Sequence, residues 1–389
     1  MPPEAVPTPN TSPLIGRREL LLGFAGAGTL AALGACSFSK PGSPNVARTD
    51  APSPSGAASP EASHEVSEAN LAASDNPDLQ LLVPYEAELG QPLPETMSFL
   101  SMPTDEASAD ELADRTAGFA RDCEAAGIKP RFIMEPTDES GQGIDLNKIT
   151  DSAHTGALHS YLQGLKKRGI TGKQLGTFVP LPEPSIPEEW NGSTDPELFG
   201  RNFTAVASTI KETFPDAQIC MMLDSASFPS GDWGARTYDA NPLLAYTNGV
   251  PAGLVDEFGL QGFPRVSGST DPHQLIQHDV AIQAAKQLQA KRIWINTGTY
   301  AVENDPDSKQ KVSATLADRA AFLQAVGGEV ASMRQSGMEV RVNIFAADKL
   351  QQGEANWHYT DAEFAAAVKP FAEQLKRSGA SLTIFDERS

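Results

Sequence analysis

Three acidic side chains stand where apolar stretches of the chain end. Glu135 follows RFIM, Glu183 follows FVPLP and Asp224 follows QICMML. Short apolar runs bounded by prolines or polar residues are typical of buried strands, so we expect these carboxyl groups at strand ends. Paired carboxylates can serve as acid and base in glycoside hydrolysis, and they also bind sugar hydroxyl groups.

Glu183 lies between Pro182 and Pro184. Prolines fix φ and remove backbone donors, so they hold the exit from the strand rigid whether or not catalysis takes place there. The alternative to a functional carboxylate is a solvated side chain in a proline-rich turn. We favour the functional interpretation of Glu183 because of its position at a strand end. For Glu135 and Asp224, a functional role and a solvated side chain are equally favoured.

Large aromatic side chains follow several of the same strand ends. Aromatic rings stack on the apolar faces of sugars, so rings and carboxylates around one cleft would suit carbohydrate binding. The alternative for each ring is packing at the rim of the fold. The residues are Trp190, Trp233, Tyr300 and Trp357.

The elements that position these residues alternate regularly along the chain. Eight strand candidates lie at 96–102, 131–136, 176–182, 218–224, 257–263, 292–297, 340–345 and 381–385. Helical patterns lie between them at 109–127, 152–169, 196–214, 242–254, 272–290, 313–337 and 360–379. The alternation predicts an α/β fold, a single (β/α)₈ TIM barrel, whose chemistry would sit at the carboxyl ends of the strands. A doubly wound open sheet is the second choice, but no glycine-rich phosphate loop follows the first strand.

The first 77 residues precede this pattern. Arg17 and Arg18, the apolar run Leu20–Leu33 and the stretch ending at Cys36 resemble a twin-arginine lipoprotein signal peptide covering 1–36. This resemblance implies lipidation of Cys36, and the alternative is an apolar segment that stays attached. Residues 37–77 are rich in Pro, Ser and Ala and predict a disordered linker before a barrel domain at 78–389. We therefore expect an exported protein, lipid-anchored at the extracellular face of the membrane or in the cell envelope.

Composition limits the classes of partner. The net charge of −20 argues against nucleic acid or a direct anionic-membrane surface as partner. Cys123 and Cys220 are predicted to be buried free thiols, with a disulfide as the alternative. His273 and His278 are five residues apart in one predicted helix, which is a poor spacing for a shared face. We expect no metal site, no cofactor, and a monomer.

From about Leu79 to Asp361 the chain resembles the catalytic domain of glycoside hydrolase family 26, the mannanase-type barrels. The matching stretches are RFIMEP, FVPLPEPSIPEEWNG, RIWINTGTY and VRVNIFAADKLQQGEANW. The resemblance implies that Glu183 takes the place of the acid/base glutamate, although Pro182 and Ser185 replace a flanking His and Asn. Glu135 and Trp357 match a glutamate and an aromatic residue. Asn296 takes the place of the nucleophilic glutamate.

The asparagine at that place changes the expected chemistry. A carboxamide is a far weaker nucleophile than a carboxylate and carries no charge to stabilise an oxocarbenium ion. One hypothesis is a hydrolase acting on a β-linked polysaccharide of the mannan, β-glucan or xylan class, with Glu183 as general acid and Asp224 or Glu135 activating water. The other is a non-catalytic carbohydrate-binding lipoprotein. A third is an envelope protein whose barrel has lost the function at the carboxyl ends of its strands, here called the mouth. The fold alone does not choose among the three hypotheses.

Overall fold

The computed structural model describes residues 74, 76–186, 195–226, 237–266, 268–304, 310–350 and 355–387. The predicted signal peptide with Cys36, almost all of the predicted linker, Trp190 and Trp233 lie outside these residues. Within them, no helix has both the length and the apolar character needed to cross a membrane.

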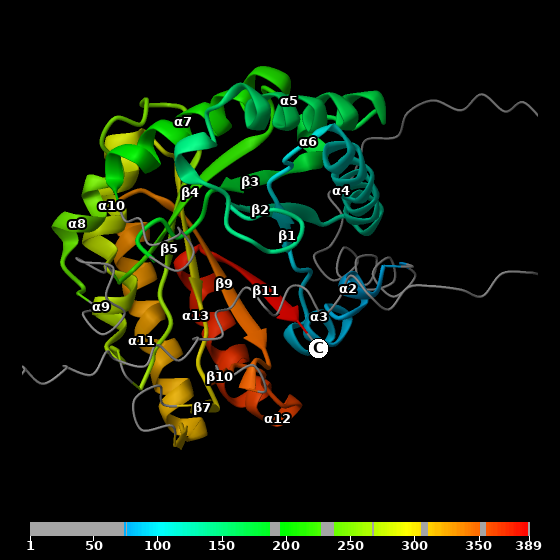
Figure 1. The fold of residues 1–389 in the computed structure, drawn as a ribbon. Coiled ribbons are helices and arrows are strands. Elements are labelled where there is room, and N and C mark those ends of the chain that lie inside the picture. Colours follow the sequence, from blue (N-terminus) through cyan, green and yellow to red (C-terminus); the bar gives the residue numbers. More distant parts are fainter. Residues whose placement is uncertain are drawn as a thin grey trace, which may run out of the picture.

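Eight parallel strands form one sheet that curls into a nearly closed barrel (Figure 1). Each strand pairs in parallel with the next. The first and last strands lie next to each other, since the rings of Phe99 and Phe385 are 5.6 Å apart. The predicted TIM barrel is confirmed, and the C-terminal SLTIF run supplies the eighth strand. In order, the strands are β1 (Glu95–Ser101), β2 (Lys129–Glu135), β3 (Thr177–Pro180), β4 (Gln218–Asp224), β5 (Glu257–Gln261), β6 (Arg292–Thr297), β9 (Glu339–Ala347) and β11 (Ser381–Glu387).

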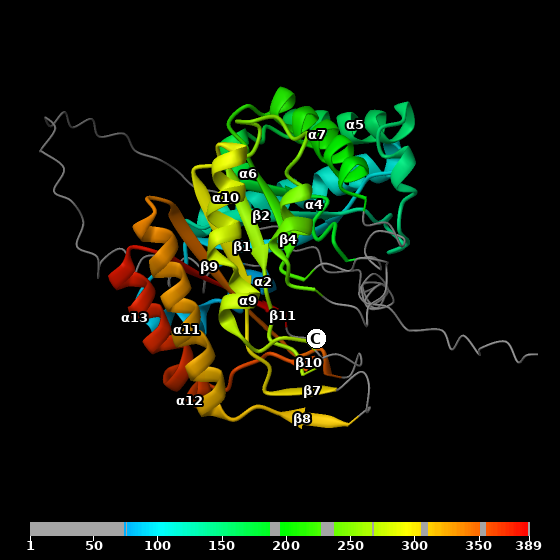
Figure 2. The same cartoon turned by 90° about the vertical axis from the view of Figure 1, so that its left-hand side faces the viewer.

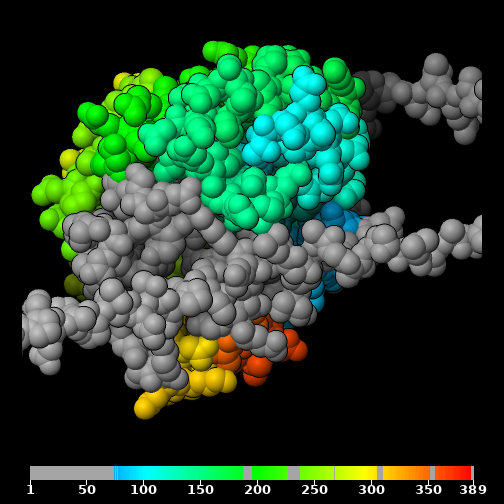
Figure 3. Space-filling view, in the orientation of Figure 1, coloured from blue at the N-terminus to red at the C-terminus, as the bar shows by residue number. Residues whose placement is uncertain are grey.

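Helices cover the outside of the strands. Local signals set their ends: Asp105 and Ser108 form a capping box at the start of α4, and a left-handed Gly127 ends it. In the space-filling view, the segments from α4 to α7 form one continuous surface (Figure 3). The longer helices are α4 (Glu106–Ala126), α5 (Ser152–Lys167), α7 (Pro196–Thr213), α10 (His278–Leu288), α11 (Leu316–Gln335) and α13 (Lys369–Ser378). The shorter ones are α2 (Pro77–Gln80), α3 (Val83–Leu89), α6 (Gly172–Leu175), α8 (Ala240–Ala245), α9 (Pro272–Ile276), α12 (Asp361–Glu363) and the single turns η3 (Leu146–Lys148) and η5 (Phe364–Val368).

Three features differ from the sequence prediction. The helix expected at 242–254 is reduced to α8, and the chain beyond it turns through the left-handed Gly249 and Gly253. The helix expected at 272–290 is broken into α9 and α10, because Gln277 between them takes a left-handed conformation with φ of 42°. A second, three-stranded sheet stands beside the end of the barrel at which β11 ends (Figure 2). Its strands are two or three residues long, which is too short for a periodic signal. They are β7 (Val302–Asn304), β8 (Lys311–Ser313) and β10 (Ala355–Asn356).

The middle of the barrel is filled by inward-facing apolar side chains of β1, β2, β3, β4 and β6. Both cysteines are buried and free, which confirms the predicted thiols. Burial raises the thiol pKa of Cys123 and Cys220, so both behave as inert packing groups. The inner layer consists of Met97, Ile133, Val179, Cys220, Met222 and Trp294.

A buried ion cluster fills the barrel at the amino-terminal ends of the strands. The Arg131 guanidinium lies 2.9 Å from the Glu95 carboxylate and 2.5 Å from the Glu257 carboxylate, and it stacks 4.2 Å from the Trp294 ring centre. Arg341 also pairs with Glu95. Burial alone would raise the pKa of Glu95, but the charges of Arg131 and Arg341 outweigh it and lower that pKa.

Replacing Arg131 by Met should destabilise the barrel in a pH-dependent way. Two buried carboxylates would lose a shared cation, which costs about 3–5 kcal/mol of unfolding free energy near neutral pH. Because the pKa of Glu95 is lowered from 4.5, its contribution is fully present above that pH and is lost as the pH falls through the folded-state pKa. The difference between the wild type and Arg131→Met should therefore shrink below pH 4.5.

Urea unfolding at neutral pH and at several acidic pH values measures this difference. Arg377→Met is the control, because Arg377 makes an exposed pair with Glu373. A cost for Arg131→Met that is as small as that of the control, or that does not vary with pH, would contradict the prediction.

Candidate carbohydrate site at the carboxyl ends of the strands

The chain leaves β3 through two left-handed residues. Leu181 and Glu183 have φ of 53° and 54°, which side chains larger than glycine rarely adopt. Each costs on the order of 1–3 kcal/mol and persists only where its surroundings enforce it. Here, the Leu181 N–H donates to the Met134 carbonyl of β2, and the Glu183 N–H donates to the Met222 carbonyl of β4. The turn between prolines is thus anchored to both neighbouring strands.

The Glu183 side chain ends a hydrogen-bonded row that crosses the barrel mouth. Gln261 Nε2 donates to Glu183 Oε1. Asn296 Nδ2 donates to Gln261 Oε1 over 2.7 Å, and Asn343 Nδ2 donates to Asn296 Oδ1 over 2.7 Å. Thr383 Oγ1 then donates to Asn343 Oδ1 over 3.0 Å. These five residues, supplied by the end of β3 and by β5, β6, β9 and β11, are called the amide row below.

The charge of Glu183 determines the orientation of every amide in the row. An ionised carboxylate can only accept, so the NH₂ group of Gln261 must face Glu183 and its oxygen must face Asn296. The same requirement passes to Asn343 and then to Thr383. All five side chains are buried, so each group left without a partner would be costly.

The amide row decides what Asn296 can do. Its NH₂ group donates to Gln261 and its oxygen accepts from Asn343, so both ends of the amide have structural partners. Asn296 therefore occupies the mouth as a link in the row. It carries no charge to attack or stabilise a sugar carbon.

The other two predicted carboxylates lie at the same end of the barrel. Glu135 is the last residue of β2 and Asp224 the last of β4, on either side of the segment that carries Glu183. Both are partly exposed, and Asp224 Oδ1 accepts a hydrogen bond from the Ala226 N–H over 2.8 Å. The structure therefore brings Glu135, Glu183 and Asp224 to one mouth, as the strand-end positions predicted.

Tyr300 and Trp357 pack the rim and are buried. Trp357 is 2% exposed, its ring contacts Phe263 and Phe345, and the Arg265 guanidinium covers it at 4.9 Å. Burial raises the pKa of the Tyr300 hydroxyl, and Glu303 and Asp318 raise it further. The structure gives these two rings the packing role that the sequence had left as the alternative to sugar stacking.

The sequence reasoning missed an aromatic row on the other side of the mouth. Phe345 of β9 stacks on Phe385 of β11 at 5.5 Å, and Phe385 meets Phe99 of β1 at 5.6 Å. Phe99 shares the strand parity of Met97, which lies in the barrel interior, so its ring is directed inward at the mouth. It is 40% exposed, an unusual value for a large apolar side chain in this chain. The alternation of inward and outward residues along β1 was the sequence signal that could have identified Phe99.

Buried polar contacts tie together the loops behind these rings. The Arg319 guanidinium of α11 donates to the Thr299 hydroxyl and carbonyl after β6 and to the His358 carbonyl after β10. It also stacks 4.0 Å from the Tyr359 ring. The loops that follow β6 and β9 are therefore held by one buried cation. On this side of the mouth, the backbone at Thr299 and His358 is fixed by hydrogen bonds from Arg319.

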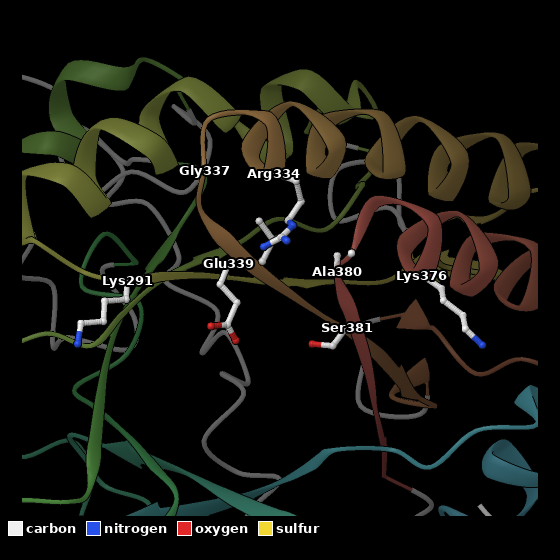
Figure 4. A pocket seen from close by; sticks show the side chains of 9 residues that line it. Lys291, Arg334, Gly337, Glu339, Lys376, Ala380 and Ser381 are labelled. Carbon is white, nitrogen blue, oxygen red and sulfur yellow. The ribbon is translucent and has the colours of Figure 1, made fainter. Parts of the chain in front are cut away.

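A surface depression of about 680 Å³ lies at the opposite end of the molecule (Figure 4). Its lining comes from the starts of β9 and β11 and the ends of α11 and α13. Because TIM barrels carry their chemistry at the carboxyl ends of the strands, this depression is not the candidate site. The lining includes Lys291, Arg334, Glu339, Lys376 and Ser381.

Comparison with known proteins identifies fold neighbours. No family model matches the chain, and no curated protein matches it. Solved structures similar to it include a β-glucosidase from Thermotoga maritima in complex with castanospermine, with 12% identity over 78% of this chain and 86% of that one and a TM-score of 0.48. The family 1 β-glucosidase of the same organism has 11% identity over 78% and 85%, with a TM-score of 0.47. Both of these proteins are named as β-glucosidases, and no comparison tests the resemblance to family 26, which stays a prediction.

Replacing Asn296 by Ala should break the amide row in the middle. Gln261 Oε1 and the Asn343 NH₂ group would be left buried without partners, at a cost of about 1–3 kcal/mol for each group. Chemical denaturation of the two proteins measures the loss. Asn248→Ala is the control because Asn248 is exposed and accepts one hydrogen bond from Gln287. Equal stability losses in the two variants would show that the row is not a structural unit.

Proposed function

We propose that the protein is a carbohydrate-binding protein that holds a β-linked oligosaccharide or polysaccharide at the carboxyl end of its barrel without cleaving it. The observation that carries the proposal is the amide row. It engages both ends of Asn296, the residue that the resemblance to family 26 puts at the position of the nucleophilic carboxylate of a retaining glycosidase. The sequence resemblance to family 26, with Asn296 at the nucleophile position, supports the same conclusion.

The two sides of the mouth supply complementary contacts for a sugar. On one side, the exposed Phe99 ring offers a stacking surface, supported from behind by Phe385 and Phe345. On the other, the carboxylates of Glu135, Glu183 and Asp224 offer acceptors for hydroxyl groups. Rings against the apolar faces and carboxylates against the hydroxyl groups are how proteins hold pyranose sugars. The ligand class would be mannan, β-glucan or xylan.

Phe99→Ala should weaken glycan binding about tenfold, equivalent to about 1.4 kcal/mol, because the stacking surface is removed while the strand remains. Calorimetry of the full chain with manno-, β-gluco- and xylo-oligosaccharides measures the affinity, and release of reducing ends measures turnover. Lys129→Ala is the control, since Lys129 is exposed at the start of β2, at the opposite end of the barrel. We expect binding, no turnover, and a loss confined to Phe99→Ala.

One observation favours a second candidate function, hydrolysis in one step with inversion. Glu183 is held in a strained left-handed conformation, and such strain is concentrated at functional sites. Glu183 would donate a proton while Asp224 or Glu135 activates water, which requires carboxyl groups about 6.5–9.5 Å apart. If the wild type releases reducing ends and Glu183→Gln does not, this candidate is established and the first is overturned. No binding by any glycan in the panel would remove both.

We also propose that Cys36 anchors the chain to a membrane at its outer face through a lipid, with residues 37–77 as the tether. The order of the arginine pair, apolar run and cysteine supports this proposal. Cells that express the protein and are fed a fatty-acid analogue should label it, and Cys36→Ser should abolish the label and release the protein from the membrane fraction. Unlabelled wild-type protein in the membrane fraction would point to a retained apolar segment instead.

A further inference from the structure

Two histidines and a glutamate meet on the outer wall of the barrel. His273 lies in α9, His278 begins α10, and Glu329 lies in the neighbouring helix α11. Glu329 Oε2 lies 2.5 Å from His278 Nδ1 and 3.2 Å from His273 Nδ1. The ligand atoms of all three side chains lie within 4.8 Å of one another. None of these residues takes part in the carbohydrate site.

The break between α9 and α10 creates this cluster. In one continuous helix, residues five positions apart point in different directions, which is why the sequence argued against a shared site. The left-handed Gln277 ends α9, where its N–H donates to the His273 carbonyl over 2.9 Å, and it starts α10. The chain turns at that point, and the two imidazole rings come to 5.4 Å with an angle of 59° between them.

We propose that His273, His278 and Glu329 form a binding site for a divalent transition-metal ion of the zinc type. The ligand set of two imidazole nitrogens and one carboxylate oxygen is one that zinc uses, with a fourth position left for water. Magnesium and calcium prefer all-oxygen sites and are disfavoured by the two imidazoles.

The two spacings between the Glu329 oxygen and the imidazole nitrogens are close to those around such an ion, and the donor atoms of all three residues lie within 4.8 Å of one another. A tetrahedral zinc ion with ligand distances of about 2.0–2.1 Å separates its donor atoms by about 3.3 Å. The 3.2 Å between His273 Nδ1 and Glu329 Oε2 matches this value, and the 2.5 Å to His278 Nδ1 requires a further opening of less than 1 Å. The His273 side chain is 60% exposed, so it has room to adjust.

A second carboxylate supports the outer side of the cluster. Asp279 Oδ1 lies 3.2 Å from His278 Nε2, on the ring nitrogen that faces away from Glu329. Metal-binding histidines commonly donate this second N–H to a carboxylate, which fixes the tautomer and orients the ring. With Nε2 protonated, His278 Nδ1 is left with a lone pair for the ion. Asp279 and the proposed ion would therefore lie on opposite ring nitrogens of His278, in the order carboxylate, histidine, ion.

An ion at this position would join the α9–α10 segment to α11. This segment follows β5, which supplies Gln261 to the amide row. Gln277, between the two histidines, donates from its side chain to the Ser225 carbonyl after β4 over 2.7 Å. The site thus stiffens the outer support of two loops at the mouth.

The test uses the full chain purified without a histidine tag and stripped with a chelator, and Zn²⁺ alone is the probe. We expect calorimetry to show a site that Glu329→Gln and His278→Gln weaken by more than about 10–100-fold, which is the loss typical of removing a residue that only supports a ligand. Added Zn²⁺ should raise the Tm of the wild type and leave the Tm of Glu329→Gln unchanged. Co²⁺ titration should give the visible absorption of a tetrahedral site in the wild type alone.

His159→Gln is the matched control, because His159 is exposed on α5 and far from the cluster. It should bind Zn²⁺ as the wild type does. If Glu329→Gln fails to fold, His273→Gln serves in its place, since that side chain is largely exposed. Wild-type protein that binds Zn²⁺ no better than the Glu329→Gln and His273→Gln variants would overturn the proposal, and the cluster would then be a carboxylate shared by two imidazole N–H groups.

Discussion

The side-chain amide of Gln261 is the contact on which the chemistry of the mouth depends. It is the only group of the amide row that touches both Glu183 and Asn296, and it can serve both in one orientation only. Because its NH₂ group faces the carboxylate, its oxygen must receive a proton donor from position 296. An asparagine satisfies that oxygen, whereas a carboxylate would set acceptor against acceptor. The identity of residue 296 and the charge of Glu183 are therefore linked through one amide.

The barrel interior explains why such a row can exist. The eight strands enclose a space that their inward-facing side chains must fill. Buried ions fill it at the amino-terminal ends of the strands, apolar groups in the middle, and amides and rings at the carboxyl ends. The ions and amides named here are tolerated because each takes part in an ion pair or a hydrogen bond.

The sequence was informative about the elements and their ends, and much less so about contacts across the barrel. Apolar runs were enough to predict the eight strands. The positions of Glu135, Glu183 and Asp224 at strand ends predicted that these three residues lie at the same end of the barrel. Strand alternation could have pointed to Phe99, but its partner Phe385 is 286 residues away and neighbours it only once the barrel curls round. Gln261 and Asn343 lay inside predicted strands, where a polar residue carries no sign of its partner.

The histidine pair shows the same limit at a shorter range. A five-residue spacing argues against a shared site only while the helix is continuous, and a single left-handed glutamine removes that condition. Gln277 resembles Leu181 and Glu183 in this respect, since each takes a positive φ although it is not glycine. Surrounding contacts enforce these turns: the β2 and β4 carbonyls at Leu181 and Glu183, and the Ser225 carbonyl at Gln277. Three of the four described non-glycine residues with positive φ thus border a candidate site, and the fourth, Gln289, ends α10.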